Sequence, residues 1–186
     1  MSRGVGGIDA IRSLLPAGGV EVFAILTVLG DFLVVTLALA VVYTFYDREE
    51  GAVALVAFVG GTLLLAGLKT ALAMPRPPVS VAAVTADGYG FPSGHAFQST
   101  VGFGLLALVI DRGRRSVRFG LAALGIALVS VSRVAIGVHY AVDVLAGVAL
   151  GVGYLWLAWS RRRYLALAIE RVCQRVRTDA SLRRRS

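Results

Sequence analysis

Both histidines of this chain belong to short polar segments that border long apolar runs. His95 closes the segment FPSGH, in which Ser93 is a candidate helix N-cap and Gly94 lets the backbone approach a ligand closely. Free amide groups at a helix N-terminus, together with the helix dipole, favour a bound anion. The pattern therefore predicts that His95 lies in the first turn of a helix, beside an anion.

His139 precedes Asp143 by four residues in the segment SRVAIGVHYAVD, and this spacing predicts that the two side chains share one helix face. A carboxylate that holds one ring nitrogen as a donor orients the imidazole and makes the other nitrogen more basic. Arg133, which ends the preceding predicted helix, offers a planar bidentate donor for phosphate. One imidazole can attack phosphorus while the other protonates the leaving oxygen, which is the chemistry of phosphoryl transfer.

Two more cations occur in the segment KTALAMPRP, where Lys69, the only lysine of the chain, precedes Arg76 by seven residues. We expect Lys69 on the last turns of a helix and Arg76 just past its end, so that both converge on one anion. Taken singly, each polar segment has a plainer explanation: snorkelling cations, a simple N-cap, or a His–Asp pair that satisfies only itself. Taken together, the three segments favour a single phosphate site.

The elements that must position these residues are membrane helices. The chain has 186 residues, 57% of them hydrophobic, and a mean hydropathy of +0.77, whereas soluble domains are about 45–50% apolar. A spanning helix needs about 20 mostly apolar residues, and the candidate segments are 22–45, 52–73, 95–110, 117–138 and 140–159. We therefore predict an all-α, polytopic transmembrane helix bundle of about five spans, with interfacial helices at the N- and C-terminal ends.

The predicted organisation has three parts: an N-terminal interfacial segment at 1–19, a transmembrane catalytic domain at 20–160, and a basic amphipathic tail at 161–186. Arginines concentrate in the 111–118 turn and in the tail, and the positive-inside rule makes that side cytoplasmic. The 74–94 loop and the 137–140 corner then share the extracytoplasmic face of the cell membrane. The apolar face of the tail favours a lipid surface, and not nucleic acid, as its partner.

Two single residues bear on the site and its cofactors. Asp31 interrupts the first apolar segment directly after Gly30, where it either pairs with a cation near the site or caps a kink. Cys173 is the only cysteine, so the chain alone forms neither a disulfide nor a cysteine-based metal site. No additional His or acidic cluster has metal-ligand spacing, and we expect neither a metal nor another cofactor.

The three polar segments resemble the three-part signature of the type 2 phosphatidic acid phosphatase family, which shares its site with the vanadium haloperoxidases. The matching patterns are K-x6-R-P from Lys69 to Pro77, P-S-G-H from Pro92 to His95, and S-R-x5-H-x3-D from Ser132 to Asp143. The patterns occur in the usual order, and the resemblance covers about residues 30–153. Many bacterial members of the family have six spans, and a second copy of this chain could occupy the position of the missing helix.

The resemblance implies a role for each matched residue. His139 attacks phosphorus and forms a phosphohistidine, Asp143 orients His139, and His95 protonates the leaving oxygen and then activates water. The phosphate-binding residues that it implies are Lys69, Arg76, Ser93, Gly94 and Arg133, with no metal.

The function implied by the resemblance is that of a membrane lipid phosphatase. Its candidate substrates are phosphatidic acid, phosphatidylglycerol phosphate and polyprenyl diphosphates. A phosphotransferase would use the same phosphohistidine but pass the phosphoryl group to a hydroxyl acceptor. A non-enzymatic lipid-binding membrane protein is the alternative from another class, and a haloperoxidase is disfavoured because those proteins are usually soluble.

Overall fold

The computed structural model describes residues 6–183, and every regular element in that part of the chain is a helix. The α-helices are α1 (Gly6–Ser13), α2 (Gly19–Leu26), α3 (Phe32–Phe45), α4 (Arg48–Leu72), α5 (Gly94–Val109), α6 (Arg115–Ala135), α7 (Ala141–Ser160) and α8 (Arg162–Arg183). Two short 3₁₀ helices, η1 (Thr27–Gly30) and η2 (Val79–Val81), complete the described elements. The predicted all-α bundle is confirmed.

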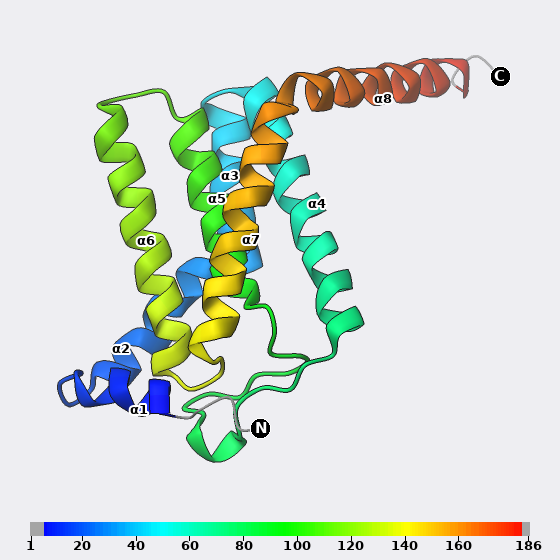
Figure 1. The fold of residues 1–186 in the computed structure, drawn as a ribbon. Coiled ribbons are helices and arrows are strands. Elements are labelled where there is room, and N and C mark those ends of the chain that lie inside the picture. The colour runs from blue at the N-terminus through cyan, green and yellow to red at the C-terminus, as the bar shows by residue number, and fades with distance from the viewer. Residues whose placement is uncertain (1–5, 184–186) are drawn as a thin grey trace.

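The central helix of the bundle is α5, which packs against α3, α4, α6 and α7 (Figure 1). Small residues allow these close approaches. A Cβ atom on Gly102 would lie 2.2 Å from Cγ1 of Val35 in α3, and one on Gly104 would lie 2.2 Å from Cδ2 of Leu155 in α7. Since lipid tails are as apolar as these side chains, close van der Waals packing is what holds the helices together.

The helices that could cross a membrane are α4, α6 and α7, and α2–η1 with α3 makes a fourth if the two parts form one span. These two parts are bent by 48° at the break, so the predicted segment 22–45 is not one continuous helix. The chain is extended at Asp31, with φ −68° and ψ 142°, between η1 and α3. The predicted third span is short: α5 has 16 residues and lies inside the bundle.

The ends of the helices follow local sequence signals. The carboxylate of Asp47 accepts a hydrogen bond of 2.9 Å from the backbone N–H of Glu50 and so caps the start of α4. This helix ends at Leu72, and its C-cap Ala73 is a left-handed residue with φ 47°, two residues before Pro75. Apart from the break at Asp31, the predicted helix boundaries therefore hold to within a few residues.

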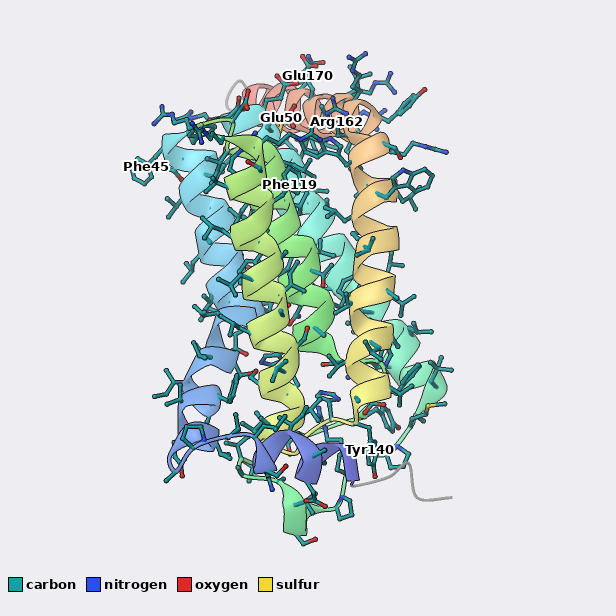
Figure 2. All side chains as sticks on the ribbon, turned by 60° about the vertical axis from the view of Figure 1, so that its left-hand side comes forward. Phe45, Glu50, Phe119, Tyr140, Arg162 and Glu170 are labelled. Carbon is teal, nitrogen blue, oxygen red and sulfur yellow. The ribbon has the colours of Figure 1, made fainter. Side chains whose placement is uncertain are left out.

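The two ends of the bundle carry different elements (Figure 1). The 74–94 loop, η2 and α1 lie at one end, whereas α8 begins at the other end and projects sideways from the bundle. Figure 2 labels Tyr140 at the first end and Glu50, Phe119, Arg162 and Glu170 at the second. The loop and the 137–140 corner thus share one end of the molecule, as the predicted topology requires.

At its end of the bundle, α1 is more than the interfacial helix expected from sequence. Ile8 is 1% exposed and belongs to a buried cluster with Ala96, Val134 and Val144. These partners come from α5, α6 and α7, so α1 is anchored to three of the helices that surround the predicted site residues. The short segment IDAIRSLL is too brief for hydropathy to reveal this packing.

Candidate active site

Six of the eight predicted site residues line one cavity of about 480 Å³, and they are Lys69, Arg76, Gly94, His95, Arg133 and His139. The other two, Ser93 and Asp143, are fully buried and are joined by a backbone hydrogen bond of 2.8 Å from Ser93 N to Asp143 O. The structure therefore brings together three segments that are far apart in the sequence. Thr27 and Asp31, from the break in the first apolar segment, line the same cavity.

His139 lies in the turn between α6 and α7, because α7 begins only at Ala141. The prediction that His139 and Asp143 share a helix face was therefore wrong in its detail, although the pair still forms. His139 Nδ1 lies 3.6 Å from Oδ2 of Asp143. That same Oδ2 atom accepts a hydrogen bond of 3.0 Å from the backbone N–H of Tyr140, which fixes the carboxylate next to the imidazole.

The other ring nitrogen of His139 identifies the tautomer. Its Nε2 atom lies 3.1 Å from Nη1 of Arg76. A guanidinium group has donors and no acceptor, so Nε2 must offer its lone pair to Arg76. The proton of the neutral ring is then on Nδ1, which faces the Asp143 carboxylate. Nε2 therefore carries the lone pair with which the ring can act as a nucleophile at phosphorus, and the Arg76 guanidinium lies beside it.

Burial lowers the pKa of His139 from the ordinary 6.5 to about 4. The carboxylate of Asp143 acts in the opposite direction, while the charges of Arg133, Arg76 and Lys69 add to the lowering. The imidazole is accordingly neutral near pH 7, which is the state in which Nε2 can attack an electrophile. Burial also lowers the pKa of the Arg76 guanidinium, and Asp143 opposes that change.

Three cations face the cavity; two of them donate to backbone oxygens of the 74–94 loop and the third donates to a hydroxyl of η1. Lys69 Nζ donates to the backbone oxygen of Pro92 at 2.9 Å, and Arg76 Nη2 donates to the backbone oxygen of Asp87 at 2.8 Å. Arg133 is only 5% exposed, and its Nη1 donates to Oγ1 of Thr27 at 2.8 Å. Three positive charges converging from separate elements create a strong field for a phosphate anion.

The N-terminus of α5 adds uncharged donors. Ser93 occupies the N-cap position, but its side chain makes no capping hydrogen bond, contrary to the prediction from its type. The buried Ser93 Oγ and Arg133 Nε atoms have no hydrogen-bond partner within the described structure. A buried unpaired polar group costs about 1–3 kcal/mol. Arg133 lines the cavity and Ser93 directly precedes Gly94, which also lines it, so both atoms fit a role in binding phosphate oxygens.

Asp31 pairs with the second histidine. Its Oδ1 atom lies 2.8 Å from Nε2 of His95, and both residues line the cavity. This contact differs from both roles that the sequence left open for Asp31, since its partner is an imidazole and its side chain makes no capping hydrogen bond. Sequence reasoning missed Thr27, for which the sole signal is a hydroxyl residue inside an apolar run.

Arg12 of α1 is a further residue that the sequence did not point to. Its Nε atom donates to the backbone oxygen of Ala135 at 2.7 Å, and its Nη2 donates to that of Val81 at 2.8 Å. It thereby ties the 74–94 loop to the end of α6, just before the turn that carries His139. Gly137 in this turn has φ +77°, and a Cβ on it would lie 2.1 Å from the Val81 oxygen.

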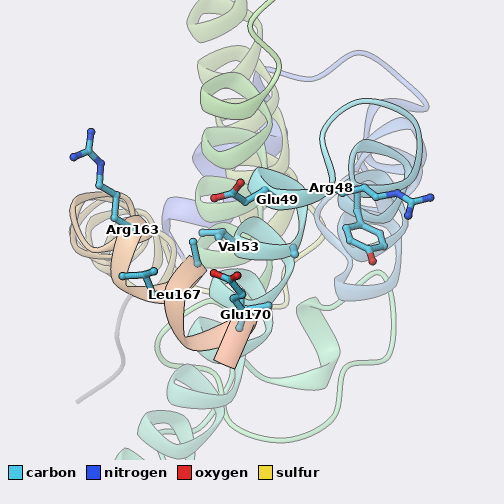
Figure 3. A pocket seen from close by; sticks show the side chains of 10 residues that line it. Arg48, Glu49, Val53, Arg163, Leu167 and Glu170 are labelled. Carbon is cyan, nitrogen blue, oxygen red and sulfur yellow. The ribbon is translucent and has the colours of Figure 1, made fainter. Parts of the chain in front are cut away.

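A larger cavity of about 660 Å³ lies at the opposite end of the bundle, between the start of α4 and α8 (Figure 3). Figure 3 shows the carboxylates of Glu49 and Glu170 near Val53, while the guanidinium groups of Arg48 and Arg163 point outward. Neither histidine and none of the predicted site residues line it. The chemistry described above therefore belongs to the smaller cavity.

No group of three or more His, Cys, Asp or Glu side chains arranged to hold a metal ion occurs among residues 6–183. The cationic residues Lys69, Arg76 and Arg133 occupy the wall of the cavity instead.

The family model of the PAP2 superfamily matches residues 50–166 of this chain, a range that contains all eight predicted site residues but neither Thr27 nor Asp31. A search of curated proteins finds no matching sequence. Two solved structures resemble the fold. The first transmembrane PAP2-type phosphatidylglycerolphosphate phosphatase from Bacillus subtilis has a TM-score of 0.77 and 24% sequence identity, with 86% of this chain and 84% of that chain covered. LpxE from Aquifex aeolicus has a TM-score of 0.69 and 22% identity, with 82% and 92% covered.

Proposed function

The chain belongs to the PAP2 superfamily, and from this premise we propose that it hydrolyses a phosphate monoester or diphosphate of a membrane lipid through a phosphohistidine on His139. The observation that carries the proposal is the cavity that His139, His95 and three cations share. A nucleophile, a proton donor and an anion site within one cavity are the parts that phosphoryl transfer needs.

In the first step His139 Nε2 forms a bond to phosphorus while the bond from phosphorus to the leaving oxygen breaks. The leaving oxygen keeps the electron pair and takes a proton from His95. Asp143 stabilises the positive charge that develops on the His139 ring. In the second step water bonds to phosphorus and gives a proton to His95, and the electron pair of the P–N bond returns to His139.

The cations stabilise the charge of the transferring phosphoryl group. Arg76 already lies 3.1 Å from the attacking nitrogen, so its guanidinium group is placed to contact a phosphate bound in line with Nε2. Lys69 and Arg133 approach from α4 and α6, and Ser93 Oγ with the Gly94 amide approaches from the start of α5. These groups supply the electrostatic stabilisation that a metal ion supplies in other phosphatases, and the proposed reaction therefore needs no metal or other cofactor.

A lipid substrate is supported by an apolar groove of about 320 Å³ between α4 and α7. Leucines from both helices line the groove, and Leu65 also lines the site cavity, so the two hollows adjoin. Figure 1 shows α4 diverging from α7 toward the end that carries the site. A hydrocarbon chain in the groove would place its phosphate beside Lys69.

Phosphatidic acid, phosphatidylglycerol phosphate and polyprenyl diphosphates all carry a terminal phosphate group on a lipid with long hydrocarbon chains. The fold shared with the Bacillus subtilis phosphatase makes phosphatidylglycerol phosphate the first of these to test. The arginine distribution supports a site on the extracytoplasmic side of the cell membrane and a cytoplasmic C-terminus. The apolar and basic faces of α8 support contact with the lipid surface on that side.

The test is phosphate release by the purified protein in detergent micelles, measured for each lipid phosphate without any added acceptor alcohol. We expect release from at least one lipid, and a loss of about 10⁴-fold or more in His139→Ala, since the nucleophile is removed. His139→Ala should elute from size-exclusion chromatography as the unmodified protein does. Turnover retained by this variant would exclude His139 as the nucleophile, and release only in the presence of a hydroxyl acceptor would indicate a phosphotransferase.

A further inference from the structure

We propose that Asp31 is a positioning residue for His95, and that the break in the first apolar segment is a fourth component of the active site. The proposal rests on the function proposed above, since it concerns the proton that His95 exchanges. Its starting point is the 2.8 Å distance from Asp31 Oδ1 to His95 Nε2. Asp31 lies outside the three polar segments that carry the family resemblance and outside the range matched by the family model.

The contact determines which nitrogen of His95 reacts. An ionised carboxylate can only accept hydrogen bonds. Nε2 of His95 therefore keeps its proton and donates a hydrogen bond to Asp31. Nδ1 is left as the nitrogen that gives a proton to the leaving oxygen and later accepts one from water. The carboxylate also stabilises the imidazolium form, in which His95 must begin the first step. Asp31 thus does for the acid what Asp143 does for the nucleophile.

The interruption between η1 and α3 places the Asp31 carboxylate beside His95. Asp31 stands at the N-cap position of α3, yet its side chain makes no capping hydrogen bond and contacts His95 instead. Gly30 allows the close approach, because a Cβ there would lie 2.6 Å from Cγ1 of Val129 and 3.3 Å from the backbone oxygen of His95. A larger residue would push the break away from the start of α5.

A second contact from the same break reaches another site residue. Thr27, at the start of η1, accepts a hydrogen bond of 2.8 Å from Arg133 Nη1. This contact concerns a phosphate-binding cation, whereas the Asp31 contact concerns the acid. Residues 27–31 therefore contact the phosphate-binding part of the site through Thr27 and the acid through Asp31. Substitutions of these two residues form a matched pair of variants.

A positioning role for Asp31 can be distinguished from a merely structural ion pair by comparing two substrates that differ in their leaving group. Protonation by His95 matters for an alkoxide leaving group, as in a lipid phosphate, and matters little for p-nitrophenolate. Loss of Asp31 should therefore lower kcat/KM, which reports the phosphoryl-transfer step, on the lipid phosphate and not on p-nitrophenyl phosphate. A general distortion of the site should impair both.

The experiment compares Asp31→Asn with Thr27→Val on phosphatidic acid and on p-nitrophenyl phosphate. For Asp31→Asn we expect kcat/KM to fall about 10–100-fold on the lipid and less than about 3-fold on the aryl phosphate. Thr27→Val should lower both by a similar factor, because it loosens a phosphate-binding group. In a His95→Gln background Asp31→Asn should cause no additional loss on the lipid. Equal losses of Asp31→Asn on both substrates, or an additive loss in that background, would overturn the proposal.

A second measurement needs no change at Asp31. The chain has only two histidines, so ¹⁵N-histidine labelling with His139→Asn for assignment identifies the His95 ring signals. Above neutral pH we expect the Nε2–H tautomer for His95, and an Nδ1–H tautomer would refute the contact on which the proposal depends. If the unmodified protein released phosphate from no substrate, the proposed function would fail, whereas the tautomer would still decide the contact between Asp31 and His95.

Discussion

Acid should destabilise the folded protein through His139, and the size of this effect follows from its burial. The side chain is almost inaccessible to solvent, and burial lowers its pKa from 6.5 to about 4. Between these two pH values the unfolded chain binds a proton that the folded chain does not bind, so acidification favours unfolding. The difference corresponds to about 3 kcal/mol of folding free energy, which is retained above pH 6.5 and lost as the pH falls toward 4.

The assay is thermal unfolding of the purified protein in detergent micelles, for the unmodified chain and for His139→Gln, from about pH 7 to about pH 4. The variant lacks the titrating imidazole, while every other acid-sensitive group is common to both proteins. The midpoint of the unmodified protein minus that of the variant should decrease by roughly 6–12 °C over this range. Parallel curves for the two proteins would show that His139 is not held neutral by burial, and would refute the reasoning.

Three further experiments test the metal-free chemistry, the orientation of the protein in the membrane and the turn that contains Gly137. Vanadate or tungstate should inhibit phosphate release competitively and EDTA should not affect it, so a loss of turnover in EDTA would contradict catalysis by cations alone. Arg48→Cys and Arg115→Cys, each in a Cys173→Ser background, should react with an impermeant maleimide from the cytoplasmic side only, and labelling of intact cells would reverse the orientation. Gly137→Ala should reduce the free energy of unfolding by about 2–4 kcal/mol in thermal or denaturant unfolding, because the new Cβ would meet the Val81 oxygen at a positive φ; unchanged stability would mean that the turn relaxes.

The sequence was informative where function depends on residues that are close together along the chain. Each polar segment contains its own spacing rule, such as the four residues from His139 to Asp143, and each lies at the end of a long apolar run. Hydropathy locates those runs. Because successive spans cross the membrane in opposite directions, each end of a run is assigned to one side of the membrane. The prediction that the three segments meet therefore required only the topology of the bundle, without any detail of packing.

The remaining features depend on contacts between distant residues, which no local pattern contains. Arg133 reaches Thr27 across 106 positions of sequence, and Arg12 reaches Ala135 across 123. Hydropathy averages over a window and therefore reads 22–45 as continuous, although Gly30 and Asp31 divide it. The position of His139 outside α7 depends in turn on where a helix starts, which propensity predicts only to within one or two residues.

The contacts of the three cations suggest why the site can be built without a buried counter-ion for each. Lys69 and Arg76 donate to backbone oxygens and Arg133 donates to a hydroxyl, so each guanidinium or ammonium group is partly satisfied by dipoles that carry no net charge. Carboxylates in these places would stabilise the cations further but would repel phosphate. Asp31 and Asp143, which lie beside the reacting groups, are each paired with an imidazole instead. Positive charge therefore stays available for the anion, while negative charge acts on the two rings that must exchange protons and form the bond to phosphorus.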